Sequence, residues 1–102
     1  MNRNRGDQVG DYVMWENDRV RVWDQVIQAG ETVGPHKHDL DYFIVVLEQA
    51  EVTAEAIGEN RSEIDRIQQD LIWVKSNGEE HTATNVDKDG RRWRNLIIEL
   101  KR

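Results

Sequence analysis

Turn residues divide this chain into short segments, and this spacing constrains the fold more than any other feature of the sequence. From residue 12 onward Gly, Asn and Asp recur about every eight to twelve residues, which is typical of an antiparallel sandwich or barrel. Between the turns, apolar residues alternate with polar ones, as in 51–57, or are β-branched and aromatic, as in 41–47. The predicted strands are 12–16, 19–24, 41–47, 51–57, 62–67, 71–74, 81–86 and 91–100. The sequence therefore predicts an all-β, antiparallel fold.

The chain of 102 residues has the length of one domain. Residues 1–11 are polar and contain glycine, so we expect a flexible N-terminal arm there and a single domain over residues 12–102. Asp87 to Gly90 is predicted to be a hairpin turn that joins the last two strands. The polar stretch 59–69 is the one place where a helix competes, and we favour a hairpin.

Composition limits the partners that this chain can have. Its 14 Lys and Arg against 20 Asp and Glu give a formal net charge of −6, which argues against a nucleic-acid partner. The chain has no cysteine, which excludes disulfides, thiolate metal sites and cysteine nucleophiles. The start lacks the apolar core of a signal peptide, and the longest apolar run, 43–47, is too short for a membrane span. We therefore expect a cytoplasmic protein that binds a small molecule and neither nucleic acid nor membrane.

Three histidines are the candidate chemical groups. His36 and His38 follow a Gly-Pro pair, and in a strand their side chains would lie on the same face, about 7 Å apart at the backbone. Two imidazoles make a weak metal site, so a third ligand is needed, and His81 at the head of a later strand could supply it. The alternative is that these are ordinary surface histidines. On this reading the sequence predicts a metal site or three unrelated side chains.

The spacing around the histidines resembles that of the cupins. Gly30, five residues and then His36-x-His38 is similar to the first cupin motif, and Gly78-x2-His81-x3-Asn85 is similar to the second. The resemblance covers residues 30–85, and the flanking strands extend it over nearly the whole domain. It implies a small antiparallel cupin-like β-barrel, of the jelly-roll or double-stranded β-helix type, with a divalent transition metal held by histidines.

One departure from the cupin pattern affects the expected chemistry. The glutamate of the first motif should fall at residue 42 or 43, where this chain has Tyr42 and Phe43. The resemblance then implies His36, His38 and His81 alone as metal ligands, with Fe, Mn, Ni, Zn, Co or Cu all acceptable. Such a neutral site favours an anionic, chelating substrate. It is similar to the three-histidine cupins that include thiol and diketone dioxygenases.

The resemblance leads to a first expectation and an alternative. We expect a mononuclear metalloenzyme that acts on a small organic acid or oxygenated metabolite, with dioxygenase chemistry first and isomerase or lyase chemistry as variants. The catalytic candidates are Tyr42, as hydrogen-bond donor, weak ligand or general acid, and Asp41, as proton carrier or partner of a histidine N–H. Tyr42 could equally be a core aromatic residue and Asp41 a solvated carboxylate. The alternative function is a non-catalytic module that binds a small molecule.

The aromatic residues and the strand edges suggest further contacts. Four tryptophans are expected to pack in the core or in an interface, with Trp73 as a possible pocket wall and Trp15 in a subunit contact. Because the edge strands of a small β-fold need covering, we also expect a homodimer.

Overall fold

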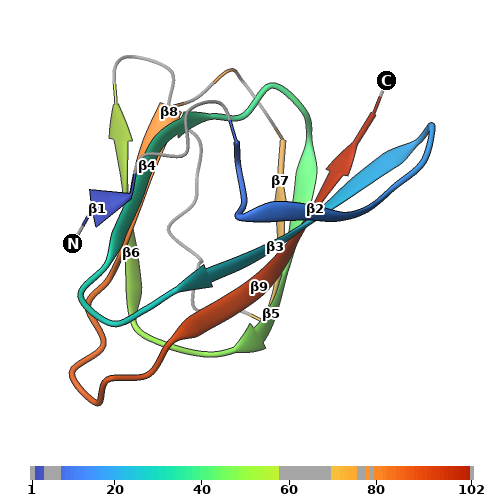
Figure 1. Ribbon diagram of the computed structural model, residues 1–102. Helices are drawn as coiled ribbons and strands as arrows, with labels where there is room; N and C mark the ends of the chain where they lie inside the picture. Colours follow the sequence, from blue (N-terminus) through green and yellow to red (C-terminus); the bar gives the residue numbers. More distant parts are fainter. Residues whose placement is uncertain (1, 4–7, 58–69, 76–77, 79, 102) are drawn as a thin grey trace.

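The computed structural model describes residues 2–3, 8–57, 70–75, 78 and 80–101, and all regular structure in this part of the chain is β (Figure 1). The described residues form nine strands: β1 (Asn2–Arg3), β2 (Tyr12–Glu16), β3 (Val20–Ile27), β4 (Thr32–Lys37), β5 (Tyr42–Glu48), β6 (Val52–Ile57), β7 (Leu71–Val74), β8 (Glu80–Asn85) and β9 (Trp93–Leu100). The all-β prediction is confirmed. Among the described residues there is no helix of the length and apolarity needed to cross a membrane.

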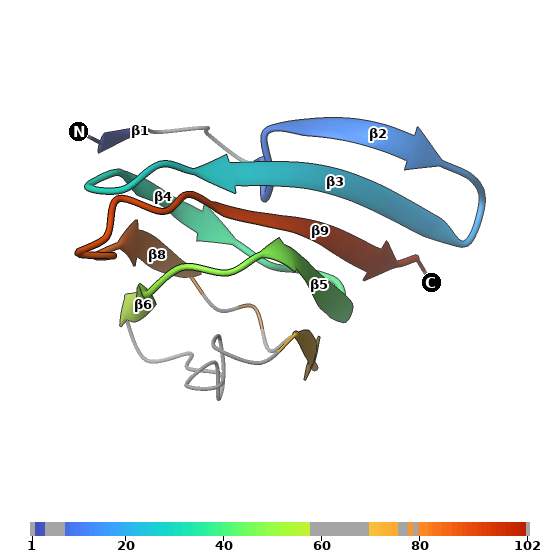
Figure 2. The same cartoon turned by 90° about the horizontal axis from the view of Figure 1, so that it is seen from below.

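The strands form two sheets that face each other (Figures 1 and 2). One sheet has four strands in the order β1-β4-β8-β6, and the other has five in the order β2-β3-β9-β5-β7. All pairings are antiparallel except that of β1 with β4. The hydrogen bonds thus divide the predicted antiparallel fold into two packed sheets, as in a jelly roll.

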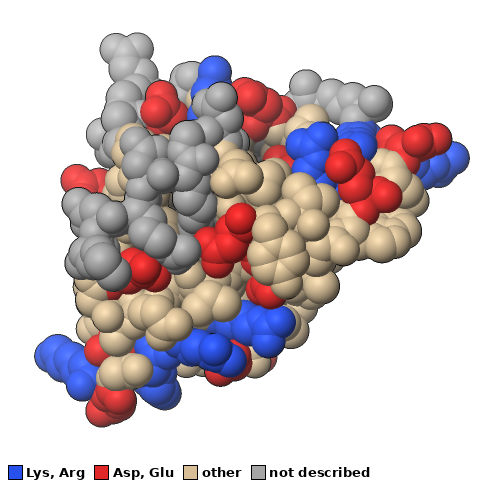
Figure 3. Space-filling view, in the orientation of Figure 1, with Lys and Arg blue, Asp and Glu red and all other residues tan. Residues whose placement is uncertain are grey.

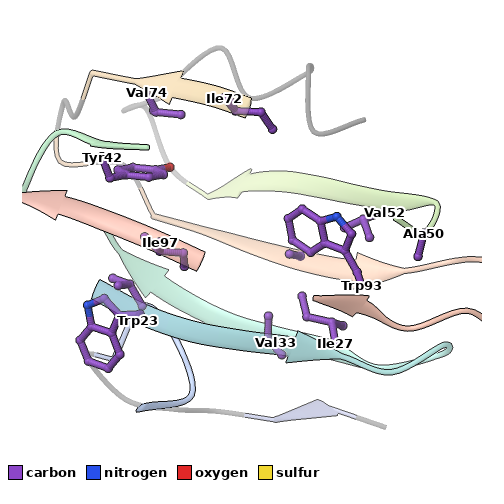
Figure 4. Close-up of a cluster of buried hydrophobic side chains, with 12 residues drawn as sticks. Trp23, Ile27, Val33, Tyr42, Ala50, Val52, Ile72, Val74, Trp93 and Ile97 are labelled. Atoms are coloured by element: carbon purple, nitrogen blue, oxygen red, sulfur yellow. The ribbon is translucent and has the colours of Figure 1, made fainter. Parts of the chain in front are cut away.

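The longest pairing joins β3 to β9 along the middle of the five-stranded sheet. All eight residues of each strand are in register, from Val20 opposite Leu100 to Ile27 opposite Trp93. Along β9, buried residues alternate with partly buried ones, so that every second side chain enters the space between the sheets. Figure 4 shows the resulting core, in which Trp93 and Ile97 lie among side chains from both sheets.

Most predicted strands are present, and two of them, 12–16 and 71–74, have the predicted bounds. The strand 62–67 and the hairpin over 59–69 lie outside the described residues. The hairpin at Asp87 to Gly90 is wrong, because β8 and β9 belong to different sheets and do not pair. The local turn is present, since the Asp87 carboxylate accepts hydrogen bonds from the backbone N–H groups of Asp89 and Arg91. A turn sequence thus fixes the bend but not the partner of the following strand.

The amino-terminal segment contacts the domain in two places. Asn2–Arg3 pair in parallel with β4, and Val9 is only 3% exposed among the core residues. The Asp11 side chain also accepts a hydrogen bond from the backbone N–H of Val26. Parts of the predicted arm are therefore packed against both sheets, whereas its mobility stays a prediction.

The basic run 91–94 does not form a cationic patch. Each of its arginines pairs with a carboxylate: Arg91 with Asp87 at 2.9 Å, Arg92 with Glu48 at 2.7 Å and Arg94 with Asp24 at 3.2 Å. Figure 3 shows basic and acidic side chains close to each other on the same face. The arginines therefore neutralise neighbouring carboxylates along the sheet.

Candidate metal centre

Strands β4 and β8 bring the three histidines together. His36 and His81 are directly opposite each other in the antiparallel pairing of these strands, so their side chains lie on the same face. His38 comes one residue after the end of β4. All three are buried, with 4%, 2% and 6% of His36, His38 and His81 exposed. The alternative of three ordinary surface histidines is therefore wrong.

Gly34 and Pro35 lie within β4, directly before His36. Gly34 has φ +102°, a conformation that glycine tolerates, and the register shifts between Val33 and His36. A Cβ atom at Gly34 would lie 2.8 Å from the backbone oxygen of His81. Glycine at this position thus allows the backbone of β4 to approach that of β8 next to the histidines.

The ring nitrogens of the three histidines point at one another. His81 Nε2 lies 2.9 Å from His36 Nε2 and 3.2 Å from His38 Nε2. Two nitrogens that bind one ion at about 2.1 Å and at right angles are about 3.0 Å apart, so both spacings fit a pair of ligands at adjacent positions on one ion. A proton on His81 Nε2 could be donated to His36 Nε2 or to His38 Nε2. A single cation, by contrast, satisfies all three lone pairs.

Burial keeps His38 and His81 uncharged at neutral pH. Burial lowers the pKa of His81 to about 4, and burial together with the neighbouring histidines places the pKa of His38 well below its ordinary value. Neutral imidazole is the form that binds transition metals, so no proton has to leave before binding. Among the described residues, His36, His38 and His81 form the group of side chains able to hold a metal ion.

Tyr42 lies against this cluster. Its ring stacks on that of His38, with ring centroids 4.2 Å apart and an angle of 18° between the planes. It is 1% exposed, and Figure 4 shows its ring inside the core near Val74, Ile72 and Ile97. The residue that replaces the cupin glutamate therefore contacts a histidine through its aromatic face.

Asp41 is placed differently. It precedes β5, is partly exposed, and its backbone oxygen accepts a hydrogen bond from the N–H of Leu100. It is not among the residues that line the cavity beside the histidines. The structure thus brings Tyr42 to the candidate centre and leaves Asp41 at its margin.

The histidines open into a cavity between the two sheets. It measures about 450 Å³, a volume that includes space open to solvent. Its lining consists of Gln25, His36, His38, Tyr42, Ile44, Ala54, Ile72, His81, Ala83, Trp93 and Ile97. No carboxylate is among these described residues, so the site lacks the negative charge that a cupin glutamate would add.

The tryptophans of the cavity differ from the prediction. Trp73, predicted as a possible wall, is 49% exposed and contacts Phe43, with the two ring planes tilted by 47°. Trp93 lines the cavity in its place, and the sequence did not indicate Gln25 as a lining residue at all. Only the period-2 pattern of β9, which puts Trp93 on the same face as Ile97, could have suggested that Trp93 points into the cavity.

Comparisons with known proteins support this reading of the fold. The chain is similar to the crystal structure of a cupin domain from Bordetella pertussis Tohama I, with a TM-score of 0.67 and 19% identity over 89% of this chain and 91% of that one. This chain has a cupin fold. The chain is also similar to the crystal structure of a conserved protein of unknown function from Streptococcus pyogenes, with a TM-score of 0.60 and 13% identity over 99% of this chain and 81% of that one. No protein-family model and no curated protein matches the sequence.

The cupin fold and the histidine cluster agree with each other. The resemblance seen in the sequence predicted both the fold and the convergence of His36, His38 and His81, and both are present. The cluster fits a cupin metal site in which histidines alone are the protein ligands.

Proposed function

We propose that this cupin binds one divalent transition metal through His36, His38 and His81 and acts on a small anionic organic acid. The observation that supports this most directly is the convergence of three buried Nε2 atoms, at 2.9 and 3.2 Å, on the wall of a cavity. A metal ion bound between these atoms would use the lone pair of each Nε2 at once, as no single proton can. The identity of the metal is left among Fe, Mn, Ni, Zn, Co and Cu.

The charge of the site favours an anionic ligand. Three neutral imidazoles leave the full charge of a divalent ion, and about three coordination positions stay open on the cavity side. No described carboxylate lines the cavity, so a substrate carboxylate or enolate would supply the missing negative charge. A bound ion would act as a Lewis acid and hold the substrate, with O2 as co-substrate in the oxygenase form of the proposal.

The residues beside the histidines would position the substrate. Tyr42, held flat against His38, would direct its hydroxyl to the bound acid and donate a hydrogen bond or a proton. Ile44, Ile72 and Ile97 would pack against the carbon skeleton and exclude water. Asp41, at the margin of the site, is retained as a proton carrier for the isomerase or lyase form of the proposal.

Metal analysis is the first test. Protein purified without a histidine tag should contain close to one equivalent of a transition metal or take it up from Fe(II), Mn(II), Ni(II) or Zn(II). His36→Ala should bind none. A wild-type protein that takes up none of these ions would disprove the metal site.

Turnover is tested next with metal-loaded protein. O2 consumption and product formation should be followed with small carboxylic acids and β-diketones, with Tyr42→Phe measured alongside. Loss of rate in Tyr42→Phe at unchanged metal content would support Tyr42 as the group that touches substrate.

A non-catalytic binding module is the second candidate. It is favoured by the cavity lining, in which the histidines and Tyr42 are the only ionisable side chains among the described residues. If the acids bind to the loaded protein with no turnover, O2 uptake or isomerisation, this second function replaces the first.

A homodimer is part of the proposal, through the outer face of the five-stranded sheet. One row of apolar side chains crosses all five strands of this sheet in register: Trp15, Val22, Ile98, Phe43 and Trp73. Trp15 is 55% and Trp73 is 49% exposed. The chain has a net charge of −6, so two copies repel each other. Because this row contains no charged residue, it is the part of the surface where two copies can pack together.

A further inference from the structure

A second set of buried polar atoms lies on the five-stranded sheet, apart from the histidines. Gln25 of β3 and Asn95 of β9 are directly opposite each other, and Trp93 is two residues before Asn95 on the same face. The three residues are 4%, 0% and 2% exposed. Within the described part of the chain, Gln25 Oε1, Trp93 Nε1 and Asn95 Nδ2 have no hydrogen-bond partner. The fold thus leaves two donors and one acceptor unsatisfied in its interior.

These atoms are not explained by a different placement of the amides. Gln25 Nε2 donates to Asn95 Oδ1 at 3.3 Å, which uses one end of each amide. Exchanging oxygen and nitrogen in both side chains would still leave one end of each without a partner. The Trp93 N–H is a donor in every case. Buried polar groups without partners are rare in proteins, and they point to a bound molecule or water that satisfies them.

The unsatisfied atoms adjoin the cavity of the candidate metal centre. Gln25 and Trp93 line this cavity together with the histidines. The register of the sheet gives their order: Tyr42 is level with Glu99, Ile44 with Ile97, and Gln25 with Asn95. An apolar level formed by Ile44 and Ile97 therefore separates the histidine end of the cavity from the end formed by Gln25 and Trp93.

Small residues leave room along this path. Ala54 and Ala83 are opposite each other in β6 and β8, and both line the cavity. Ala83 is two residues beyond His81, on the same face of β8. A ligand bound at the histidines can therefore extend past these methyl groups toward Gln25.

We propose that Gln25 and Trp93 form a second polar subsite, which binds an uncharged hydrogen-bonding group at the far end of a metal-chelating organic acid. This proposal rests on the proposed function, because the acid end of the ligand is held by the metal. The distal group has to accept from Trp93 Nε1 and pair with the free end of the Gln25 amide, and a carboxamide can do both in either orientation of that amide. No charged side chain of the described residues lines this end of the cavity, so a distal carboxylate or ammonium would be buried without a counter-ion from them. Asn95 orients the Gln25 amide through their hydrogen bond.

Two acids that differ only in the distal group test the subsite. Glutaramate has a carboxamide where 5-methylhexanoate has a branched alkyl group of similar shape. Titration calorimetry on Zn(II)-loaded protein should give a dissociation constant about tenfold lower for glutaramate, because the alkyl group leaves the buried polar atoms unpaired. In Gln25→Met this preference should fall by about tenfold, with unchanged zinc content.

The exposed Gln28 offers a matched control. Gln28→Met makes the same replacement outside the cavity and should keep the preference for glutaramate. The melting temperature of metal-free Gln25→Met should not fall far below that of this control, because Gln25 already has an unsatisfied atom. If Gln25→Met does not fold, Trp93→Phe is used in the same titration, because phenylalanine keeps an aromatic ring and lacks the N–H donor. It should also lose the preference for glutaramate.

The outcomes separate the subsite from the metal site. Equal affinity of the wild type for the two acids, or a preference that Gln25→Met and Trp93→Phe retain, would overturn the subsite and leave the metal site intact. A wild-type protein that binds no zinc would overturn the proposed function, and the subsite with it.

Discussion

Replacing Gly34 by alanine should weaken both the fold and the metal site, and the structure supplies controls that separate the two causes. Gly34, Gly30 and Gly90 all have positive φ, at 102°, 82° and 77°. An added Cβ meets nothing within 4 Å at Gly30 or Gly90, but lies 2.8 Å from the His81 backbone oxygen at Gly34. All three substitutions thus introduce backbone strain, and only Gly34→Ala adds a close contact.

The magnitudes follow from these contacts. Positive φ costs an alanine about 1–2 kcal/mol, which is the whole expected effect of Gly30→Ala and Gly90→Ala. Ordinary contact begins near 3.4 Å, so relieving the Gly34→Ala contact would separate β4 from β8 by about 0.6 Å, at a further cost of about 1–3 kcal/mol. The melting temperature of Gly34→Ala should therefore lie at least about 4 °C below that of either control.

The same displacement should reduce metal affinity. His36 is two residues from Gly34 and directly opposite His81, so a movement of about 0.6 Å exceeds the roughly 0.2 Å that metal–ligand distances tolerate. We expect Gly34→Ala to bind Zn(II) about 10–100-fold more weakly than wild type, and Gly30→Ala to bind it as the wild type does. Calorimetric unfolding and zinc titration measure both effects. If Gly34→Ala matches Gly30→Ala in both, the close approach of β4 to β8 does not position the histidines.

Three further predictions concern the ion, a loop and the outer face. Zn(II) at about 100 times its dissociation constant should raise the melting temperature by about 10–20 °C, and His81→Phe should abolish this rise; an equal rise in His81→Phe would place the ion elsewhere. Hydrogen bonds from the Arg91 side chain and from backbone N–H groups hold the pKa of Asp87 well below its usual range. The ionised Asp87 therefore stabilises the fold fully above about pH 4, and this contribution is lost as the pH falls from there toward the lowered pKa. Asp87→Asn should therefore lower the melting temperature at pH 7 and have less effect at pH 3; an equal loss at both values would contradict this reading. The double variant Trp15→Ser, Trp73→Ser should be monomeric by light scattering. Val86→Ser removes an exposed apolar side chain outside the apolar row of the five-stranded sheet, and it should remain dimeric like the wild type. A wild-type protein that is monomeric at all concentrations would disprove the dimer.

The sequence predicted the local elements of this fold better than their partners. Strands such as 12–16 and 71–74 could be located because apolar residues end at turn residues on either side. The turn at Asp87 also occurs where it was expected, yet it leads from one sheet to the other. Turn chemistry acts over four residues, whereas pairing depends on strands far apart in the chain.

The same limit explains which site residues were found. His36, His38 and His81 were predicted because their spacing resembles that of the cupin motifs. Trp93 and Gln25 follow no motif, and their inward direction depends on the register of β3 and β9. The outer face of this sheet also has large apolar side chains, so hydrophobicity alone could not distinguish Trp73, which points outward, from Trp93.

The two walls of the cavity belong to different sheets, and this has a consequence for the order of binding. An ion on His36, His38 and His81 would link β4 to the beginning of β8 and slow hydrogen exchange in the β4–β8 ladder. It would change exchange little in the long β3–β9 ladder. An organic ligand that reaches from the ion to Gln25 would contact both sheets and slow exchange in both. The ion would thus rigidify one half of the molecule first, and the ligand would then join it to the other half, so that each binding event favours the next.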